Sequence, residues 1–162
     1  MAVLAPLRVF VVDDDQDTTE SMRLLLKHWG HEVHVANDGF FAIEQAPNVK
    51  PDLMLVDLAM PKLDGLAVAR RLRSEPALAE MPLVALTGYA DPPHRQQALD
   101  AGFDECLIKP LPADDLLGLL DRVRTRIAAS AELAKRTLEI AAKSRQQNQR
   151  SRQSLDKQGL DN

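Results

Sequence analysis

Short apolar runs alternate with amphipathic segments along the first 127 residues of the chain. The apolar runs predict strands over 7–12, 32–36, 52–57, 82–86 and 105–108. Between the strands, apolar residues recur every three or four positions, which predicts helices over 18–29, 39–46, 65–74 and from 92 onward. Alternating strands and helices favour an α/β fold, with a parallel sheet, right-handed crossovers and helices on both faces.

Capping and breaking residues place the ends of these predicted helices. Asp38 and Asp64 stand where an N-cap side chain can accept a backbone hydrogen bond. Gly30 follows the first helix as a C-terminal glycine, and Pro47 is expected to end the second. Asp91 precedes two prolines, a sequence that suits the start of a helix.

The last predicted helix is longer than one small domain needs. It begins near Ala113, and its apolar spacing continues to Ala142. Thirty helical residues span ~45 Å. After Ala142 the apolar spacing fades into a polar sequence that is expected to be disordered. We therefore predict one domain over 1–127, followed over 128–162 by a helical extension and a polar tail.

Charge and composition agree with this division. Residues 1–127 carry 13 basic and 20 acidic side chains, whereas residues 128–162 carry 7 basic and 4 acidic ones. The whole chain has a net charge of −4, which does not favour general nucleic-acid binding. Its single cysteine excludes an internal disulfide, and it has neither a membrane-length apolar run nor a signal-peptide pattern. A cytoplasmic location is expected.

Five polar residues follow four of the predicted strands. They are Asp13, Asp14, Asp57, Thr87 and Lys109. The carboxyl ends of parallel strands meet at one edge of the sheet, so these side chains are expected to share one crevice. Three carboxylates, a hydroxyl and an ammonium group suit a site that holds a divalent cation and accepts a phosphoryl group.

The residue types suggest a division of roles. Asp57 ends the most apolar strand and can act as the nucleophile, giving an aspartyl phosphate. Asp13 and Asp14 repel each other unless a cation lies between them, and carboxylate oxygens suit Mg²⁺. Lys109 can serve as a counter-ion to the phosphoryl group, and Thr87 can donate a hydrogen bond to it.

In these motifs the chain resembles the receiver domain of two-component response regulators, the chemotaxis-type phosphoacceptor module. The resemblance covers about residues 6–127 and rests on VVDD (11–14), PDLMLVDLAMPKLDG (51–65), ALTGYA (85–90) and AGFDECLIKP (101–110). It implies a flavodoxin-like, doubly wound five-stranded sheet of order 2-1-3-4-5, with an extended C-terminal helix in this chain. It also implies that Asp57 is the phosphoacceptor and that the carbonyl of Ala59 completes a Mg²⁺ site with the acidic pair. By the same resemblance, Thr87 is the switch hydroxyl, and Lys109 precedes a cis bond to Pro110.

One position departs from the family pattern. Three residues before the lysine, where relatives usually carry an aromatic ring that reports phosphorylation, this chain has Cys106. The usual coupling through that ring is therefore not expected, and Cys106 fits a small core residue. Tyr89, two residues after Thr87, occupies a position that tunes dephosphorylation in relatives.

Two other kinds of site were compared with this interpretation. A haloacid-dehalogenase-type phosphatase also uses Mg²⁺ and an aspartyl phosphate, and Asp15-x-Asp17-x-Thr19 matches its motif by letter. The phosphatase motif directly follows a strand, but Asp15 lies two residues beyond that position. At Asp57, which does end a strand, the second aspartate of the motif is replaced by Ala59. A calcium loop is excluded because Thr18 and Leu24 stand where its glycine and glutamate are required.

The output of such a protein is less constrained by sequence. Residues 128–162 are too few and too polar for a helix-turn-helix domain, so no DNA-binding domain is expected. The favoured function is a single-domain response regulator, or a receiver from a hybrid kinase, that contacts other proteins. Its expected partners are a histidine kinase or a histidine phosphotransfer protein and a downstream protein, not a membrane. The extension can pair two chains into a homodimer or remain solvated.

Overall fold

Five parallel strands form one sheet in the computed structural model, which describes residues 5–89 and 91–158. The order is β2-β1-β3-β4-β5, as the resemblance implied. The strands are β1 (Arg8–Val12), β2 (Glu32–Ala36), β3 (Leu53–Asp57), β4 (Leu83–Thr87) and β5 (Glu105–Ile108).

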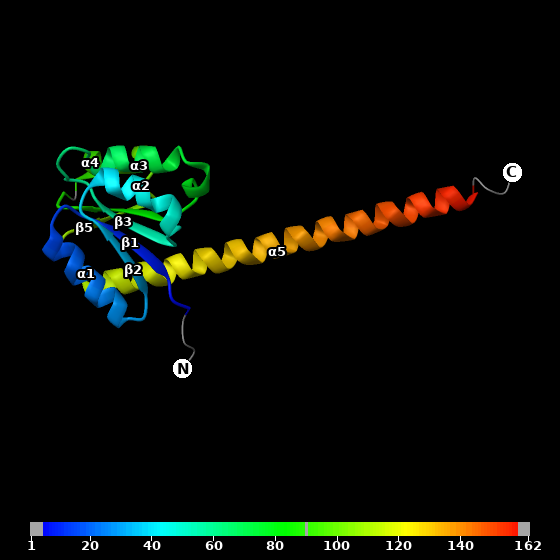
Figure 1. Ribbon diagram of the computed structural model, residues 1–162, viewed down its shortest axis with the longest axis horizontal. Helices are drawn as coiled ribbons and strands as arrows, with labels where there is room; N and C mark the ends of the chain where they lie inside the picture. The colour runs from blue at the N-terminus through cyan, green and yellow to red at the C-terminus, as the bar shows by residue number, and fades with distance from the viewer. Residues whose placement is uncertain (1–4, 90, 159–162) are drawn as a thin grey trace. The chain divides into compact units, whose positions relative to one another are not determined.

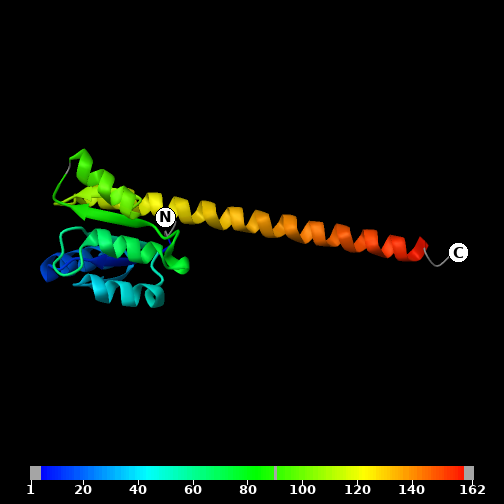
Figure 2. The same ribbon diagram turned by 90° about the horizontal axis from the view of Figure 1, so that it is seen from above.

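Helices cover both faces of the sheet (Figures 1 and 2). One face carries α2 (Gly39–Val49), α3 (Gly65–Arg73) and α4 (Pro92–Ala101). The other carries α1 (Gln16–His28) and the first turns of α5 (Ala113–Gln158). A short 3₁₀ helix, η1 (Pro76–Leu78), precedes β4. This is the doubly wound arrangement in which polar groups gather at the carboxyl ends of the strands.

The central strands are buried on both sides because helices cover both of their faces. Every residue of β3 and β4 is buried, and Val56 lies opposite both Val12 and Ala85 in the sheet register. Continuous apolar runs are therefore favoured over alternating ones in these strands. The edge strand β2 has an exposed start and a partly buried middle, and its sequence EVHVA alternates polar and apolar residues.

Among the first three helices, two boundaries differ from those predicted by more than one residue. α1 begins at Gln16 rather than residue 18, because the side chain of Asp15 accepts a hydrogen bond from the backbone N–H of Asp17 and caps the helix. α2 does not end at Pro47 but continues to Val49. Pro47 falls in the last turn, where it removes a single intrahelical hydrogen bond, so the helix runs on until Lys50 adopts a left-handed conformation.

The expectation of disorder after Ala142 is wrong, since α5 continues to Gln158. The reason lies in local preferences rather than in apolar spacing. Residues 143–158 contain no glycine or proline and are rich in glutamine, arginine and lysine, which favour helix. Hydroxyl groups add local bonds: Ser151 donates to the carbonyl of Gln147, and Ser154 donates to that of Ser151.

The chain divides into two structural units, residues 1–123 and 124–162, four residues earlier than the predicted boundary at 127. In the second unit, every described side chain from 128 to 155 is exposed. Among the described residues, no helix combines the length and apolar composition that crossing a membrane requires.

Arg73 joins several elements at the amino-terminal edge of the sheet. Its guanidinium group donates hydrogen bonds to the carbonyls of Leu78, Ala79, Met81 and Gly102, at 2.7–3.1 Å. It also forms an ion pair of 3.0 Å with Asp104. One side chain thus connects α3, η1, the start of β4 and the turn before β5.

Candidate functional site

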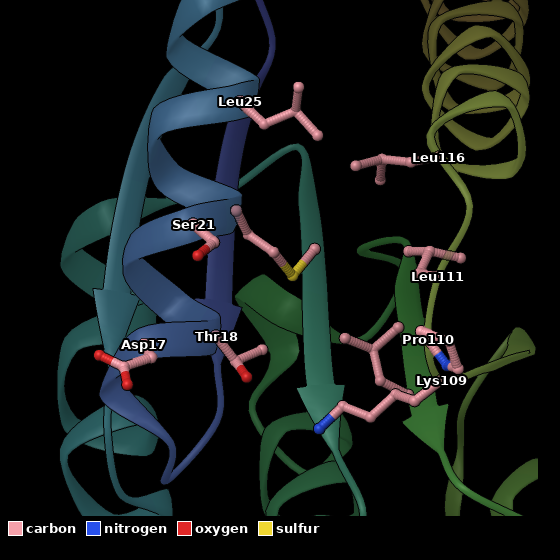
Figure 3. Close-up of a pocket in the computed structure, with 10 residues that line it drawn as sticks. Asp17, Thr18, Ser21, Leu25, Lys109, Pro110, Leu111 and Leu116 are labelled. Carbon is pink, nitrogen blue, oxygen red and sulfur yellow. The ribbon is translucent and has the colours of Figure 1, made fainter.

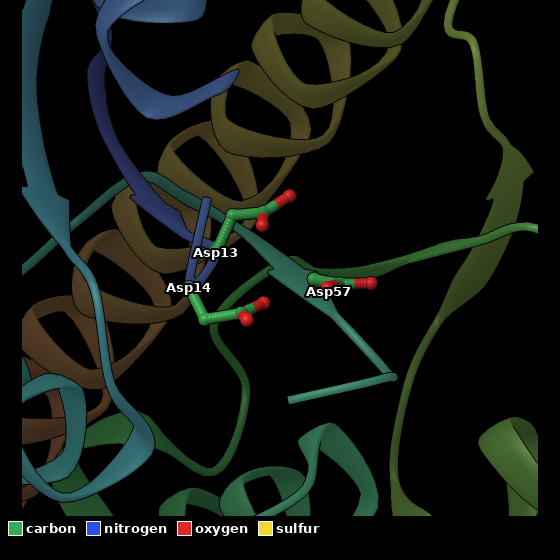
Figure 4. Close-up of side chains that lie close together, drawn as sticks. All are labelled: Asp13, Asp14 and Asp57. Carbon is green, nitrogen blue, oxygen red and sulfur yellow. The ribbon is translucent and has the colours of Figure 1, made fainter. Parts of the chain in front are cut away.

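Three carboxylates meet at the carboxyl ends of β1 and β3. Asp13 and Asp14 directly follow β1, and Asp57 is the last residue of β3 (Figure 4). One oxygen from each carboxylate lies within 4.8 Å of the others. Asp13 and Asp57 are buried, whereas Asp14 is exposed. Carboxylate oxygens this close, open to solvent on one side, fit the donor set that Mg²⁺ prefers.

The Asp57 carboxylate is in an unfavourable environment for a negative charge. Burial raises its pKa above the usual value, and the nearby Asp13 raises it further. Lys109 and the backbone N–H of Ala59, which lies 3.3 Å from Asp57 Oδ1, oppose this rise without cancelling it. Because burial makes the negative charge of Asp57 unfavourable, a cation bound nearby would interact favourably with this carboxylate.

Lys109 supplies the positive charge of the site. Its ammonium nitrogen lies 2.6 Å from Asp13 Oδ2 and 3.5 Å from Asp57 Oδ1. Burial lowers the pKa of Lys109, but the hydrogen bond to Asp13 and the charge of Asp57 outweigh burial and raise the pKa above its usual value. The lysine is therefore a fixed cation next to Asp57.

Thr87 ends β4, one residue after Leu86, which lies opposite Asp57 of β3. Its side chain is buried, and its hydroxyl oxygen accepts a 3.0 Å hydrogen bond from the backbone N–H of Tyr89. Its carbonyl accepts one from the backbone N–H of Lys109, at 2.8 Å, so strands β4 and β5 stay paired up to the site. Tyr89 is 60% exposed at the rim of the site.

The remaining predicted site residues lie near this centre. Ala59 is exposed in the loop after β3. The Lys109–Pro110 peptide bond is cis, as the resemblance implied. Cys106 is half-buried in β5, beside Ala85 of β4, and burial raises the pKa of its thiol. These contacts agree with Cys106 as a small packing residue.

Sequence reasoning missed two residues that shape the site. The amide of Asn37 donates to the carbonyl of Asp13 at 2.9 Å and to the hydroxyl of Thr19 at 3.1 Å, which holds the end of β1 in place. Gly65 begins α3 so close to β3 that a Cβ atom there would lie 2.5 Å from the Asp57 carbonyl oxygen. Gly65 is the last residue of the PDLMLVDLAMPKLDG motif, which is the sequence signal at this position, but its close approach to β3 is visible only in the structure.

A groove of about 580 Å³ runs beside the site (Figure 3). One wall is the face of α1 that carries Thr18, Ser21 and Leu25, and the other is formed by residues 109–111 with Leu116. Figure 3 shows the ammonium group of Lys109 at the same end of the groove as Thr18. The groove is therefore mostly apolar, with a positive charge at the end nearest the carboxylates.

The chain is similar to curated regulatory proteins over this domain. It is 42% identical over 118 residues to the gliding motility regulatory protein of Myxococcus xanthus, which covers 72% of this chain and 15% of that protein. It is 41% identical over 112 residues to response regulator MprA of Mycobacterium sp. (strain KMS), covering 69% of this chain and 48% of MprA. The chain thus spans about half of MprA and a small part of the Myxococcus protein.

Solved structures show the same architecture. The chemotaxis protein CheY4 of Vibrio cholerae has a TM-score of 0.70 and 28% identity, and the match covers 74% of this chain and 99% of CheY4. The receiver domain of sensor histidine kinase PA1611 from Pseudomonas aeruginosa, described with a magnesium ion coordinated in its active-site cleft, has a TM-score of 0.69 and 28% identity. That match covers 75% of this chain and 99% of that domain.

The family model of the response regulator receiver domain matches residues 9–121, well over half of the chain. The matched range contains strands β2 to β5, all of β1 except Arg8, and every residue of the acidic cluster and its lysine. The chain therefore belongs to the response regulator receiver domain family of two-component signalling.

Proposed function

We propose that this chain accepts a phosphoryl group from a phosphohistidine onto Asp57 and signals through protein contacts. An oxygen of the Asp57 carboxylate attacks phosphorus, the bond from phosphorus to the imidazole nitrogen of the donor breaks, and that nitrogen keeps the bonding electrons. The product is an aspartyl phosphate. The chain then catalyses only its own phosphorylation and dephosphorylation, as a signalling module rather than an enzyme with a turnover substrate.

The observation that carries this proposal is the position of the Lys109 ammonium group, 2.6 Å from Asp13 and 3.5 Å from Asp57. Asp57 already experiences burial and a neighbouring negative charge, so adding a phosphoryl group requires cations nearby. Lys109 provides one, and the hydroxyl of Thr87 provides a hydrogen-bond donor, because its bond with the Tyr89 N–H uses the oxygen as acceptor and not the O–H proton.

Mg²⁺ would provide the second positive charge. Asp13, Asp14 and Asp57 would hold it, together with the backbone carbonyl of Ala59, and it would neutralise negative charge on the phosphoryl oxygens. Asp15 and Asp17, the letters of the phosphatase-like motif, do not belong to this cluster. Asp15 caps α1, which supports the receiver over a phosphatase.

The groove beside α1 supports a histidine kinase or histidine phosphotransfer protein as the phosphoryl donor. It contains apolar side chains such as Leu25 and Leu116 in the same groove as Lys109, so a partner can bury apolar surface while its phosphohistidine approaches Asp57. We propose that this exchange takes place in the cytoplasm and that the downstream partner is a protein.

We further propose that the second unit joins two chains into a homodimer. Leu133, Leu138 and Ile140 are each at least 66% exposed. Between 127 and 144 the charged residues occupy one side of the helix, and the other side carries only apolar and small side chains. An isolated helix gains little stability in water, so pairing such faces would be favourable.

Incubation with phosphoramidate and Mg²⁺ tests the phosphorylation site. Intact-protein mass spectrometry should show one added phosphoryl group per chain, sensitive to hydroxylamine, in the wild type and none in Asp57→Asn. Asp52→Asn is a matched control, because Asp52 is a partly buried aspartate just before β3, at the opposite end from the site. Full labelling of Asp57→Asn would contradict the proposal.

A further inference from the structure

A small hollow lies between the loops that follow β3 and β4. Its volume is about 180 Å³. Leu58, Ala59 and Asp64 line it from the β3 side, while Thr87, Tyr89 and His94 line it from the β4 side. Ala59 donates its backbone N–H to Asp57, and Thr87 directly follows Leu86, which lies opposite Asp57 in the sheet. The hollow therefore borders residues that flank Asp57 on β3 and β4, which is the side from which we expect water to approach its carboxylate.

Two rings are stacked at the rim of this hollow. The ring centroids of Tyr89 and His94 are 4.8 Å apart, and the ring planes differ by 14°. Both side chains are substantially exposed, so burial in the core does not impose this arrangement. An aromatic pair of this geometry restricts the orientation of each ring.

The His94 ring is itself held by a carboxylate. Its Nδ1 atom donates a hydrogen bond to Asp91 Oδ1, and the same oxygen accepts the backbone N–H of His94 at 3.0 Å. Asp91 is the N-cap of α4, so its position is fixed by the helix. Asp91 thus holds His94, and His94 stacks on Tyr89. The backbone N–H of Tyr89 in turn donates to the Thr87 hydroxyl oxygen.

We propose that His94 is a positioning residue which, held by Asp91, keeps the Tyr89 ring across the hollow and so lengthens the life of the phosphoryl group on Asp57. This rests on the proposed function of Asp57. In the loss reaction, a water oxygen attacks phosphorus and the bond from phosphorus to the Asp57 oxygen breaks. The carboxylate is restored, inorganic phosphate leaves, and the proton from water passes to the solvent.

Measuring the loss of the phosphoryl group after removal of phosphoramidate tests this role. Replacing His94 by Ala should shorten the half-life by about threefold to tenfold, a factor typical of losing one aromatic pair. Replacing His94 by Phe should restore a half-life near that of the wild type, because a phenyl ring can stack on Tyr89. The rate of labelling should be unchanged in both variants.

A second histidine provides a matched control. His34 on β2 also pairs with a carboxylate, Glu32, and is similarly exposed, but it lies at the far edge of the sheet. His34→Ala should therefore leave the half-life unchanged. If His34→Ala shortens the half-life as much as His94→Ala does, the effect is general destabilisation and the proposal is overturned.

The pH profile separates positioning from acid–base catalysis. Nδ1 of His94 donates to Asp91 in both charge states of the ring, so the ratio of the His94→Ala rate to the wild-type rate should stay constant from about pH 5 to 8. The other titratable groups at the hollow, Asp64, Tyr89 and Asp91, remain in both proteins. A ratio that changes with pH, a half-life unaffected by Ala, or no rescue by Phe would overturn the proposal. Absence of labelling in the wild type would instead refute the proposed function.

Discussion

Lys109 and Asp13 are 96 residues apart in the sequence, yet their side chains form an ion pair of 2.6 Å in which Asp13 is almost fully buried. A buried carboxylate without its counter-ion is strongly destabilising. The pair therefore connects the stability of the fold to the chemistry proposed at Asp57, because the same ammonium group lies near both carboxylates.

Lys109→Ala should lower the free energy of unfolding by roughly 1–3 kcal/mol, because Asp13 then loses its partner. It should also slow phosphorylation without abolishing it, since Asp57 supplies the nucleophile. Urea unfolding and phosphoramidate labelling measure the two effects. Lys62→Ala, at an exposed lysine outside the acidic cluster, is the control and should change neither. Unchanged stability in Lys109→Ala would mean that the ion pair contributes nothing.

Added Mg²⁺ should raise the melting temperature, since the folded acidic cluster binds the ion and the unfolded chain does not. At a concentration one hundred times the dissociation constant, the stabilisation is about 2.7 kcal/mol. Asp14→Ala should remove most of this response. Asp17→Ala, an exposed aspartate outside the cluster, should keep it. Equal responses in the two variants would place the ion elsewhere.

Asp57→Asn should be more stable than the wild type at neutral pH without Mg²⁺. The folded state raises the pKa of Asp57 above 3.8, so its contribution to stability is present below pH 3.8 and is lost as pH rises through the folded-state pKa. The melting temperature of the variant should exceed that of the wild type by a few degrees at pH 7, and the difference should disappear below pH 3.8. A constant difference across pH would assign the effect to packing.

Gly65→Ala should destabilise the domain by about 1–3 kcal/mol, because the new Cβ atom meets the backbone of Asp57 and Leu58 at 2.5–2.8 Å. Labelling at Asp57 should slow as well. The contrasting variant is Gly118→Ala, in α5, where the Cβ atom has ordinary contact distance to Arg122. It should stabilise the protein by about 0.5–1 kcal/mol. Chemical denaturation of both variants checks the opposite signs.

Removing the residues after 127 should leave the rate and stoichiometry of labelling unchanged, because the acidic cluster and Lys109 lie in the first unit. If the full chain is a dimer, light scattering should show the truncated chain as a monomer. In the full chain, Leu133→Glu combined with Leu138→Glu should have the same effect, whereas Lys135→Glu on the charged side should not. A dimer that survives truncation would place the interface on the receiver unit.

The sheet and the main residues of the site could be predicted from sequence because the information is local. Asp13, Asp57 and Thr87 each end an apolar run, and parallel strands bring such ends to one edge. Asn37 and Gly65 could not be predicted in the same way. The partners of Asn37 lie 24 and 18 residues away, and the constraint on Gly65 comes from β3, which only the folded chain places beside it.

The C-terminal helix shows where sequence patterns based on burial predict too little structure. Its polar end was expected to be disordered because it cannot bury apolar surface, yet helix formation there depends on backbone preference. Pro47 is a similar case, since a proline in the last turn removes only one intrahelical hydrogen bond and does not end the helix. Sequence patterns thus located buried elements well, but they misjudged segments whose structure does not depend on burial.

The five partners of Arg73 have a consequence for how this domain can diverge among relatives. They immobilise the amino-terminal edge of the sheet, opposite the loops that carry Asp57 and Thr87. Inherited changes in the active-edge loops, including those around Tyr89 and His94, can therefore accumulate without loosening the scaffold. Duplicated copies of such a gene can acquire different signalling durations while keeping one architecture.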